Sequence, residues 1–299
     1  MADAFVIETA GLIKYYDEVA ALRGLELKVP AGSICGFLGR NGAGKTTTIK
    51  VLLGMARPTE GQARVFGLRA DAARDSVDIR RRTGFVSDEK GLFDYMSVEE
   101  IIRFTASFYP RWRRDLEDRY VRKFDLPLNR TVKALSRGTR TKLALLLSLC
   151  RGAELLILDE PTSGLDPATT EEVLQAIVSH VANDATTVFF SSHQIAEVDQ
   201  VADHVAIIHR GRTVVAGALD DLRERFRRLQ LVFDGEAPQP VFRAPGVERV
   251  WRDGRVLTVL SSGGSEQLLD EARALSPVAV NVAPVTLKEI FLETVAAED

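Results

Sequence analysis

The feature that most constrains this 299-residue chain is a glycine-rich loop between an apolar segment and a helical one. The loop covers residues 39–46 and reads Gly-Arg-Asn-Gly-Ala-Gly-Lys-Thr. It matches the phosphate-binding pattern G-x-x-x-x-G-K-[ST] at every fixed position. The apolar residues 34–38 before it predict a short strand, and the residues from Thr46 onward predict a helix. A strand–loop–helix unit of this kind is typical of an α/β fold with a parallel sheet.

The residue types of the loop suit an anionic ligand. Glycines let the backbone turn so that consecutive N–H groups converge on phosphate, and the following helix contributes its positive N-terminus. We expect Lys45 to reach the β- and γ-phosphates and the Thr46 hydroxyl to bind Mg²⁺. The loop therefore predicts a site for a nucleoside triphosphate with magnesium, formed by Gly39, Arg40, Asn41, Gly42, Ala43, Gly44, Lys45, Thr46 and Thr47.

A second apolar run, 155–158, ends in Asp159 and Glu160. A carboxylate at the C-terminal end of a buried strand beside a phosphate loop lies where Mg²⁺ needs a ligand or a water-holding partner. Asp159 is predicted to fill that role, and Glu160 to take a proton from the attacking water. The alternative is that both acids merely end a strand, which is less favoured beside a fully matched loop.

Apolar segments alternate with helical ones over most of the chain. Strands are predicted at 22–30, 34–38, 62–66, 83–86, 154–158, 186–190 and 205–208, and helices within 97–126, at 139–150 and at 167–181. This order favours an α/β core with a mainly parallel sheet. Ser97 and Glu100 predict a capping box, and Asp166 before Pro167 predicts a helix N-cap. The character of the sequence changes after about Arg228, where clustered arginines are followed by several prolines. We therefore predict a main domain over 1–226, with a helical subdomain at about 97–150. A small α+β accessory domain is predicted over 227–299.

The composition excludes several classes of protein. Apolar residues make up 45 % and charged residues 27 %, as in soluble globular proteins. The net charge of −3 gives no argument for binding nucleic acid or membrane lipid. We find no secretory signal and no apolar run long enough to span a bilayer, so we expect that the chain does not cross a membrane alone. Cys35 and Cys150 both lie in apolar segments and are predicted to be buried free thiols.

Further motifs resemble those of the ATP-binding cassette (ABC) ATPases. Residues 135–139, Leu-Ser-Arg-Gly-Thr, resemble the family signature Leu-Ser-Gly-Gly-Gln, and Ser136 precedes Asp159 by the family's usual spacing. His193 follows a predicted strand and matches the switch histidine, while Tyr16 stands where relatives stack an aromatic ring on adenine. The D-loop motif is matched by Ser163, Gly164, Leu165 and Asp166. The motifs follow the family's order from residue 12 to about residue 217.

The resemblance implies a fold and an activity. The fold would be a P-loop NTPase core of ABC type, with a mainly parallel sheet, an antiparallel β subdomain and a helical subdomain. The activity would be ATP hydrolysis, with Glu160, His193 and Lys45 as catalytic residues and Mg²⁺ near Thr46, Asp159 and Asp88. Two cassettes would pair head to tail, so that Ser136 and Gly138 of one contact ATP held by the phosphate loop of the other.

The resemblance also implies partners and a location. The chain is most similar to stand-alone exporter-type ATPase subunits, which work with an integral membrane permease in a separate chain. The second cassette would be an identical or a different one. We expect the helical region 97–130 and the loop from Asp88 to Phe93 to contact the permease. The chain would then lie in the cytoplasm, peripherally on the inner face of the cell membrane, and no nucleic acid partner is expected.

Two departures from the family pattern leave questions open. Asp88, followed by Glu89, stands where the family usually has glutamine in the loop that touches Mg²⁺ and the permease. The signature has Arg137 in place of its first glycine and Thr139 in place of glutamine. Arg137 would either add positive charge near the phosphates or face solvent.

Two other functions remain as alternatives. One is a soluble ABC ATPase that acts on nucleic acid or the ribosome, and the other is a regulatory nucleotide-binding module without turnover. A single cassette without a heptad run argues against the first. Glu160 and His193 argue against the second. The arginine runs 80–82 and 111–114 are predicted to be solvated or to face a partner rather than nucleic acid.

Overall fold

The computed structural model describes residues 5–262 and 265–296. Contacts within the chain divide it into two units, Met1–Ala216 and Gly217–Asp299. The boundary predicted between residues 226 and 227 falls inside the second unit, after the short helix α8 (Leu219–Arg225). The first unit has two sheets and the second unit has one, and each unit has its own apolar core.

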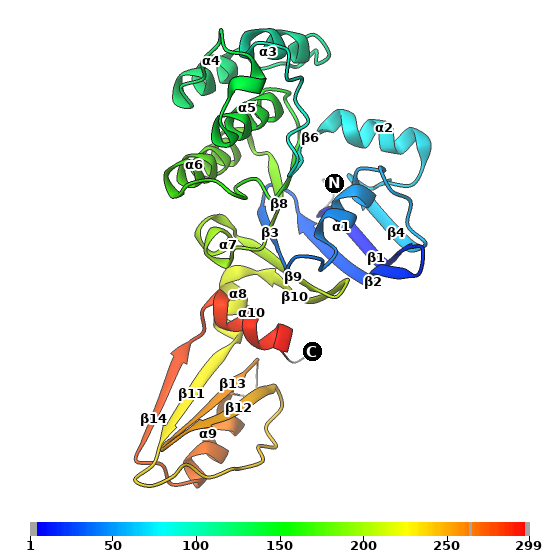
Figure 1. The fold of residues 1–299 in the computed structure, drawn as a ribbon. Coiled ribbons are helices and arrows are strands. Elements are labelled where there is room, and N and C mark those ends of the chain that lie inside the picture. Colours follow the sequence, from blue (N-terminus) through cyan, green and yellow to red (C-terminus); the bar gives the residue numbers. More distant parts are fainter. Residues whose placement is uncertain (1–4, 263–264, 297–299) are drawn as a thin grey trace. The chain divides into compact units, whose positions relative to one another are not determined.

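The first unit is built on a six-stranded sheet with the strand order β10-β9-β3-β8-β7-β6 (Figure 1). Its strands are β3 (Ile34–Leu38), β6 (Thr83–Val86), β7 (Leu155–Asp159), β8 (Thr187–Ser192), β9 (His204–His209) and β10 (Arg212–Ala218). The pairs β3–β8, β3–β9, β6–β7 and β7–β8 are parallel. Every residue of β3, β7 and β8 is buried, as expected of parallel strands covered on both faces. The predicted parallel α/β core is confirmed.

A second, antiparallel sheet in this unit has the order β2-β1-β4-β5. It consists of β1 (Phe5–Tyr16), β2 (Val19–Pro30), β4 (Glu60–Val65) and β5 (Leu68–Arg69). Apolar residues of β1 and β2, including Ile7 and Leu25, share one core cluster with Ile49 of the helix that follows the phosphate loop. This sheet therefore supports the loop from the side. Strand β1 was not predicted, because Gly11, with a φ of +56°, and shifts of register interrupt its alternation.

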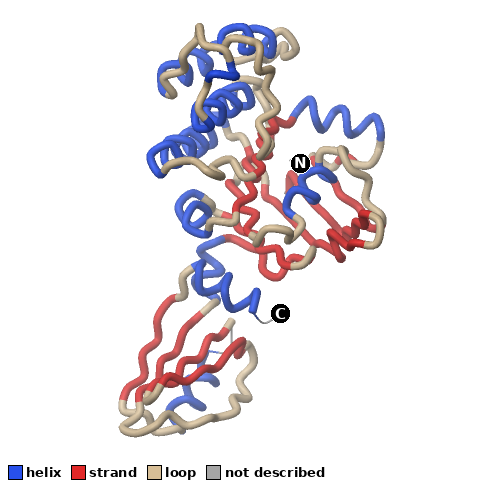
Figure 2. Tube along the Cα trace, viewed as in Figure 1, coloured by secondary structure: helices blue, strands red, loops and turns tan. Residues whose placement is uncertain are grey.

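Seven α-helices of the first unit lie among the described residues (Figure 2). They are α1 (Lys45–Leu52), α2 (Ala73–Arg82), α3 (Val98–Ala106), α4 (Arg114–Lys123), α5 (Arg137–Leu149), α6 (Pro167–Asp184) and α7 (Ile195–Val201). Helices α3, α4 and α5 gather at one end of the unit in Figure 1. The predicted capping box of Ser97 and Glu100 begins α3, and Asp166 caps α6 as predicted. No helix in the described part of the chain is both long and apolar enough to cross a membrane.

The second unit is an α+β fold, as predicted for the end of the chain. Its antiparallel sheet has the order β12-β13-β11-β14. The elements are α8, β11 (Arg227–Val232), β12 (Val247–Asp253), β13 (Val256–Ser261), α9 (Ser265–Ala274), β14 (Ala279–Pro284) and α10 (Leu287–Ala296). Leu229 and Leu231 of β11 pack with Leu268 and Ala272 of α9 in one core cluster.

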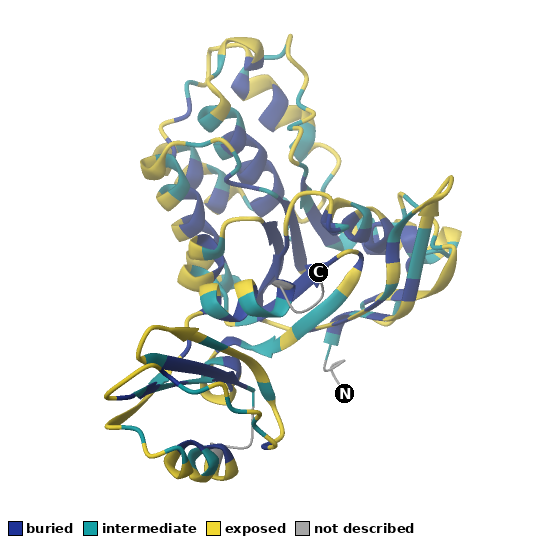
Figure 3. Ribbon diagram, turned by 60° about the horizontal axis from the view of Figure 1, so that its bottom comes forward, coloured by how far each residue is buried: buried dark blue, intermediate teal, exposed yellow. Residues whose placement is uncertain are grey.

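Burial colouring shows the central strands of the first unit as continuously buried, while its helices expose one face each (Figure 3). Two phenylalanines join neighbouring strands in this core. Phe37 of β3 and Phe189 of β8 are fully buried, and their ring centroids lie 5.1 Å apart. This contact fixes the two strands whose C-terminal ends carry the phosphate loop and His193.

Replacing Phe189 by alanine should destabilise the first unit by about 3–5 kcal/mol, because the change removes a buried ring and leaves a cavity. Urea unfolding followed by fluorescence or circular dichroism measures this loss. The matched control is Phe108→Ala, since Phe108 is 62 % exposed and its loss should cost under about 0.5 kcal/mol. Equal losses for the two variants would contradict the assignment of the core.

Candidate nucleotide-binding site

The phosphate loop joins the end of β3 to the beginning of α1, as predicted. Gly44 is the N-cap of α1 with a φ of +111°, which is a conformation that favours glycine. A Cβ atom at Gly44 would lie 2.8 Å from the backbone oxygen of Ala21, and one at Gly39 would lie 2.7 Å from that of Ile208. The loop thus threads between neighbouring backbones that leave no space for side chains at these two positions. The loop leads directly into the N-terminus of α1, and a helix N-terminus favours anions.

Lys45 is held at the mouth of the loop by acceptors of the chain itself. Its Nζ donates hydrogen bonds to the backbone oxygens of Gly39 (2.7 Å) and Arg40 (3.3 Å). It also lies 3.0 Å from Oε1 of Glu160, while only 6 % of the Lys45 side chain is exposed. Because this ammonium group is buried and paired, it is held in place more firmly than that of an exposed, flexible lysine side chain.

Glu160 joins Lys45 to His193. The second carboxylate oxygen, Oε2, lies 2.8 Å from Nδ1 of His193, and the Glu160 N–H donates to Oγ of Ser191 (3.0 Å). Its φ of +46° is in the left-handed region, which is uncommon for a residue with a side chain and costs about 1–3 kcal/mol. Backbone strain of this kind is common at functional sites, and here it turns the carboxylate from the end of β7 toward the phosphate loop.

Asp159 lies just beneath, 3 % exposed, and its Oδ1 accepts a hydrogen bond from Oγ of Ser191 (2.6 Å). Ser191 thus orients both acids at once. Nearby, Oε2 of the buried Glu197 accepts from Oγ1 of Thr162 (2.6 Å) and from Oγ of Ser192 (2.9 Å). These bonds fasten the end of β7 to the end of β8. Ser191, Ser192 and Glu197 were not predicted, although two serines that end an apolar strand just before His193 were a usable signal.

Most of the predicted site residues line one cavity of about 380 Å³. Its lining residues are Ala21, Arg40, Asn41, Gly42, Gly44, Lys45, Thr46, Thr47, Asp88, Glu160, Ser163 and His193. Residues separated by more than a hundred positions therefore converge on one space. Five predicted ATP-binding residues are not part of this lining: Gly39 and Ala43 of the loop itself, and Tyr16, Ser136 and Gly138. Tyr16 ends β1 at 43 % exposure, with Nζ of Lys14 4.8 Å from its ring centroid.

The signature segment forms the N-terminus of α5. Ser136 is the N-cap, and its Oγ accepts a hydrogen bond from the N–H of Thr139 (3.1 Å). The prediction that this helix begins at Thr139 was wrong: it begins at Arg137, because Ser136 is the N-cap and its hydroxyl satisfies one of the first free N–H groups, that of Thr139. The side chains of these two residues also form a hydrogen bond, with 2.8 Å between Oγ of Ser136 and Oγ1 of Thr139.

Arg137 faces two other motifs of its own chain. Its Nη2 donates to Oγ of Ser163 (3.4 Å) in the D-loop and lies 3.9 Å from Oδ1 of Asp88. A Cβ atom at Gly164 would lie 2.5 Å from Nη1 of Arg137, so the guanidinium covers the D-loop glycine. The side chain is nevertheless 60 % exposed. Arg137 therefore reaches the rim of the cavity through its contact with Asp88. The next residue, Glu89, is exposed, and its backbone oxygen accepts a hydrogen bond from the Ser87 hydroxyl.

Comparison with known proteins agrees with this geometry. Residues 22–163 match the model of the family described as ABC transporter. A bacitracin transport ATP-binding protein, BcrA, from Bacillus licheniformis is 36 % identical over 225 residues, which cover 75 % of this chain and 73 % of that protein. The chain belongs to the ATP-binding subunits of ABC transporters. It is accordingly an ATPase, and the cavity at the phosphate loop is the candidate for its nucleotide site.

Two further relatives extend the likeness. A daunorubicin resistance ATP-binding protein, DrrA3, from Streptomyces coeruleorubidus is 33 % identical over 308 residues, covering 98 % of this chain and 96 % of that protein. The similarity therefore includes the second unit of the ABC subunit. A solved ATP-binding subunit of an ABC transporter superposes with a TM-score of 0.66 at 28 % identity, covering 73 % of this chain and 92 % of the other.

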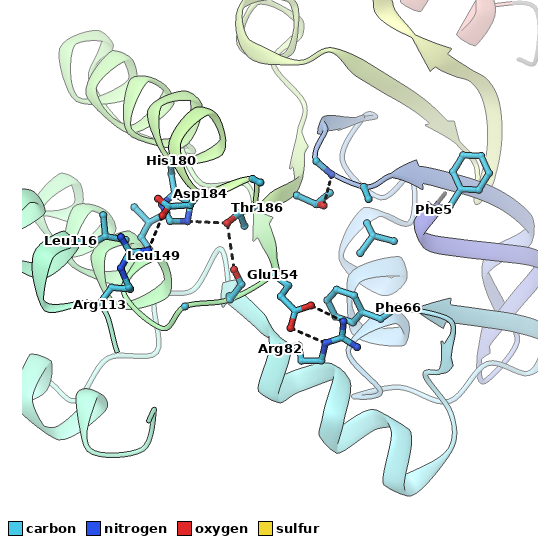
Figure 4. Close-up of a pocket in the computed structure, with 17 residues that line it drawn as sticks. Phe5, Phe66, Arg82, Arg113, Leu116, Leu149, Glu154, His180, Asp184 and Thr186 are labelled. Carbon is cyan, nitrogen blue, oxygen red and sulfur yellow. Dashed lines mark hydrogen bonds and ion pairs between the residues drawn. The ribbon is translucent and has the colours of Figure 1, made fainter. Parts of the chain in front are cut away.

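Another cavity of the ABC subunit, about 590 Å³, lies elsewhere (Figure 4). It is lined by residues at the N-terminal ends of β3, β7 and β8, opposite the ends that carry the nucleotide site. Two arginines reach it, but each is paired with a carboxylate of the chain: Arg82 with Glu154 (2.7 Å) and Arg113 with Asp184 (2.7 Å). With these cations neutralised and no glycine-rich loop, the cavity lacks the features that bind phosphate.

The arginines of the two runs, 80–82 and 111–114, also contact groups of the chain itself. Arg80 donates to the backbone oxygen of Leu53, and Arg81 lies 3.4 Å from Asp78. Arg114 lies 2.8 Å from Glu117. These side chains, like Arg82 and Arg113, serve contacts within the chain, so the runs do not form a free basic surface.

Replacing Ser191 by alanine should lower both stability and ATP turnover. The change leaves Oδ1 of Asp159 and the N–H of Glu160 without their shared buried partner, at a cost of about 1–3 kcal/mol. Urea unfolding and steady-state phosphate release measure the two effects. Ser179→Ala, at an exposed position of α6, is the control. Wild-type turnover in the Ser191 variant would show that this hydroxyl does not position the acids.

Proposed function

We propose that this ABC subunit works as one of two cassettes that hydrolyse ATP and drive export through a separate membrane permease. The observation that carries the proposal is the Glu160 carboxylate, which contacts Lys45 on one side and His193 on the other at the wall of the nucleotide cavity. A general base has to lie within hydrogen-bond reach of the proton that it takes, and this carboxylate lies beside the two groups proposed to contact the phosphates.

The contacts suggest how ATP would use the site. Phosphate oxygens bound at the loop would compete with Glu160 for Nζ of Lys45, because both are anionic acceptors. Glu160 would then be free to accept a proton from the attacking water, while His193 stays oriented beside the γ-phosphate. The proton thus moves from water to a carboxylate that the fold already holds at the cavity, and Lys45 neutralises charge on the transferred group.

Magnesium fits the donor set of this site. The Thr46 hydroxyl is exposed at the cavity, and the Asp159 carboxylate lies under its wall at the end of β7. In the described residues, three or more His, Cys, Asp or Glu side chains do not gather in a way that could hold a metal ion by themselves. We therefore propose that Mg²⁺ is held jointly by Thr46, by Asp159 or a water bound to it, and by the nucleotide, with Asp88 as a further candidate. Such an ion would neutralise charge on the β- and γ-phosphates.

The position of the signature supports a shared site. Ser136 and Gly138 do not line the cavity that contains Lys45 of the same chain. They lie at the N-terminus of α5, where unpaired N–H groups favour an anion. We propose that they contact ATP bound by a second cassette, so that hydrolysis depends on closure of the pair. Tyr16, exposed at the end of β1, is proposed to stack on adenine when ATP is bound.

An exposed aromatic cluster is the best candidate for the permease contact. It consists of Phe93, Tyr95, Phe104 and Phe108, which are 46 %, 74 %, 41 % and 62 % exposed. Successive rings contact one another, with centroids 5.0–5.9 Å apart. Contiguous exposed aromatic rings mark a partner surface. The loop that leads into this cluster begins at Asp88 on the nucleotide cavity, so a permease docked here would be linked to the state of the nucleotide.

The names of two relatives support export as the direction of transport, and the proposed permease contact implies where the subunit lies in the cell. The two relatives are named for bacitracin transport and for daunorubicin resistance, and both names suit export. We propose the same direction for this chain, with the cargo selected by the permease. Docking through the aromatic cluster would hold the subunit on the inner face of the membrane, where ATP is available.

Replacing Glu160 by glutamine should leave ATP binding intact and lower turnover by about 10²–10⁴-fold, because an amide cannot act as the base. Nucleotide titration and phosphate release, with and without the permease, measure the two properties. Lys45→Ala is the matched comparison: it should lose tight ATP binding as well as turnover. Undiminished hydrolysis in the glutamine variant would assign the base to another group.

Replacing Phe104 and Phe108 by glutamate should detach the subunit from its permease, because two charges would enter an apolar interface. The measurement is the share of the subunit recovered with membranes of its own cells, and the yield of its complex after detergent extraction. Val77→Glu, at a 39 %-exposed position of α2, is the control. ATP affinity should not change in either variant. Undiminished membrane recovery of the double variant would exclude this surface.

A further inference from the structure

The two edges of the sheet in the second unit differ in character. Edge strand β12 contains Glu248, Arg249, Arg252 and Asp253, and its register shifts between Val247 and Arg249. Charged residues and irregularities of this kind keep an edge from pairing with other strands. Edge strand β14, which forms the other margin of the sheet in Figure 1, reads Ala-Val-Asn-Val-Ala-Pro. It has no charged residue, and proline occurs only at its end.

Strand β14 also carries apolar side chains that its own unit does not cover. Val280 and Val282 stand opposite Leu231 and Leu229 in the register with β11, so they share the face of these leucines. The leucines are 0 % and 1 % exposed beneath α9, whereas Val280 is 37 % and Val282 46 % exposed. Val278, just before the strand, is 62 % exposed. Helix α9 therefore covers the middle of the sheet and leaves the valines at this margin open.

The sequence of β14 matches itself when reversed. Residues 279–283 read Ala-Val-Asn-Val-Ala in either direction. In an antiparallel pair centred on Asn281, Val280 of one copy stands opposite Val282 of the other, and Ala279 opposite Ala283. All four valines then lie on one face, with opposed Cβ atoms about 4.5–5.5 Å apart.

We infer that β14 pairs with β14 of a second copy of this chain, centred on Asn281, and joins two four-stranded sheets into one. The inference extends the proposed function, in which two cassettes meet around ATP, and it makes the second cassette an identical chain. The pairing gives the second unit a role: it keeps two cassettes near each other when their nucleotide sites are apart. A strand pair is smaller than a stable interface of about 1,200–2,000 Å², so it would act by raising effective concentration.

Disulfide trapping in the full-length chain tests the pairing. Asn281→Cys places identical residues opposite each other at the centre of the pair, where Cα atoms about 4.5–5.5 Å apart permit a disulfide. The native thiols of Cys35 and Cys150 give little background, because both are buried and burial raises their pKa. Without nucleotide, mild oxidation should give roughly tenfold more covalent dimer than Val241→Cys, a control at a 91 %-exposed position of the same unit.

Two further variants make the result decisive. Adding Val280→Lys to Asn281→Cys should reduce the covalent dimer to the control level, because opposed lysines and lost valine contacts oppose pairing. Equal dimer yields for Asn281→Cys and Val241→Cys, or no effect of the lysine, would overturn the inference. Association driven by ATP is measured separately on Glu160→Gln by light scattering. Loss of that association alone would contradict the two-cassette function and leave the β14 pairing standing.

Discussion

The contact on which the site depends is the bridge from Lys45 through Glu160 to His193. It joins three separate elements: the phosphate loop after β3, the end of β7 and the residue after β8. These elements are neighbours only because β3, β8 and β7 lie side by side in a parallel sheet, where C-terminal ends meet at one edge. The strained backbone of Glu160 and its bond to Ser191 aim the carboxylate into the bridge. The sheet thus brings the residues of the candidate site together.

Sequence reasoning found the elements whose signals are local. The strand β3 and the first four residues of β7 are continuous apolar runs, β6 is a short segment that ends in Phe85 and Val86, and the caps at Ser97 and Asp166 are signalled by nearby residues. It missed α2, where only Ser76 and Ile79 are buried and three arginines follow, because such a helix has almost no apolar period. It also missed β14, because this short strand is mostly apolar yet mostly exposed and lacks the alternation of a half-buried strand.

The residues of the candidate site also fall into those with a local sequence signal and those brought together only by the fold. The loop residues and the pair Asp159 and Glu160 are contiguous motifs, so their chemistry is visible in the sequence. Ser191 and Glu197 act through bonds between β7, β8 and α7, and those bonds exist only once the strands are adjacent. The proximity of Arg137 to Asp88 is also a product of the fold. It places the two departures from the family pattern beside each other, at the rim of the cavity, so an added cation accompanies an added carboxylate.

In the proposed function, each hydrolytic site is completed by the signature of a second cassette. Mixing two inactive variants tests it most directly: Lys45→Ala, which lacks the phosphate contact, and Gly138→Asp, which places a repelling charge in the signature. A mixed dimer would contain one intact site, formed by the phosphate loop of the second variant and the signature of the first. If the site is shared, mixing should restore ATP hydrolysis, up to about a quarter of the wild-type rate for random pairing. A mixture that stays as inactive as its components would contradict it.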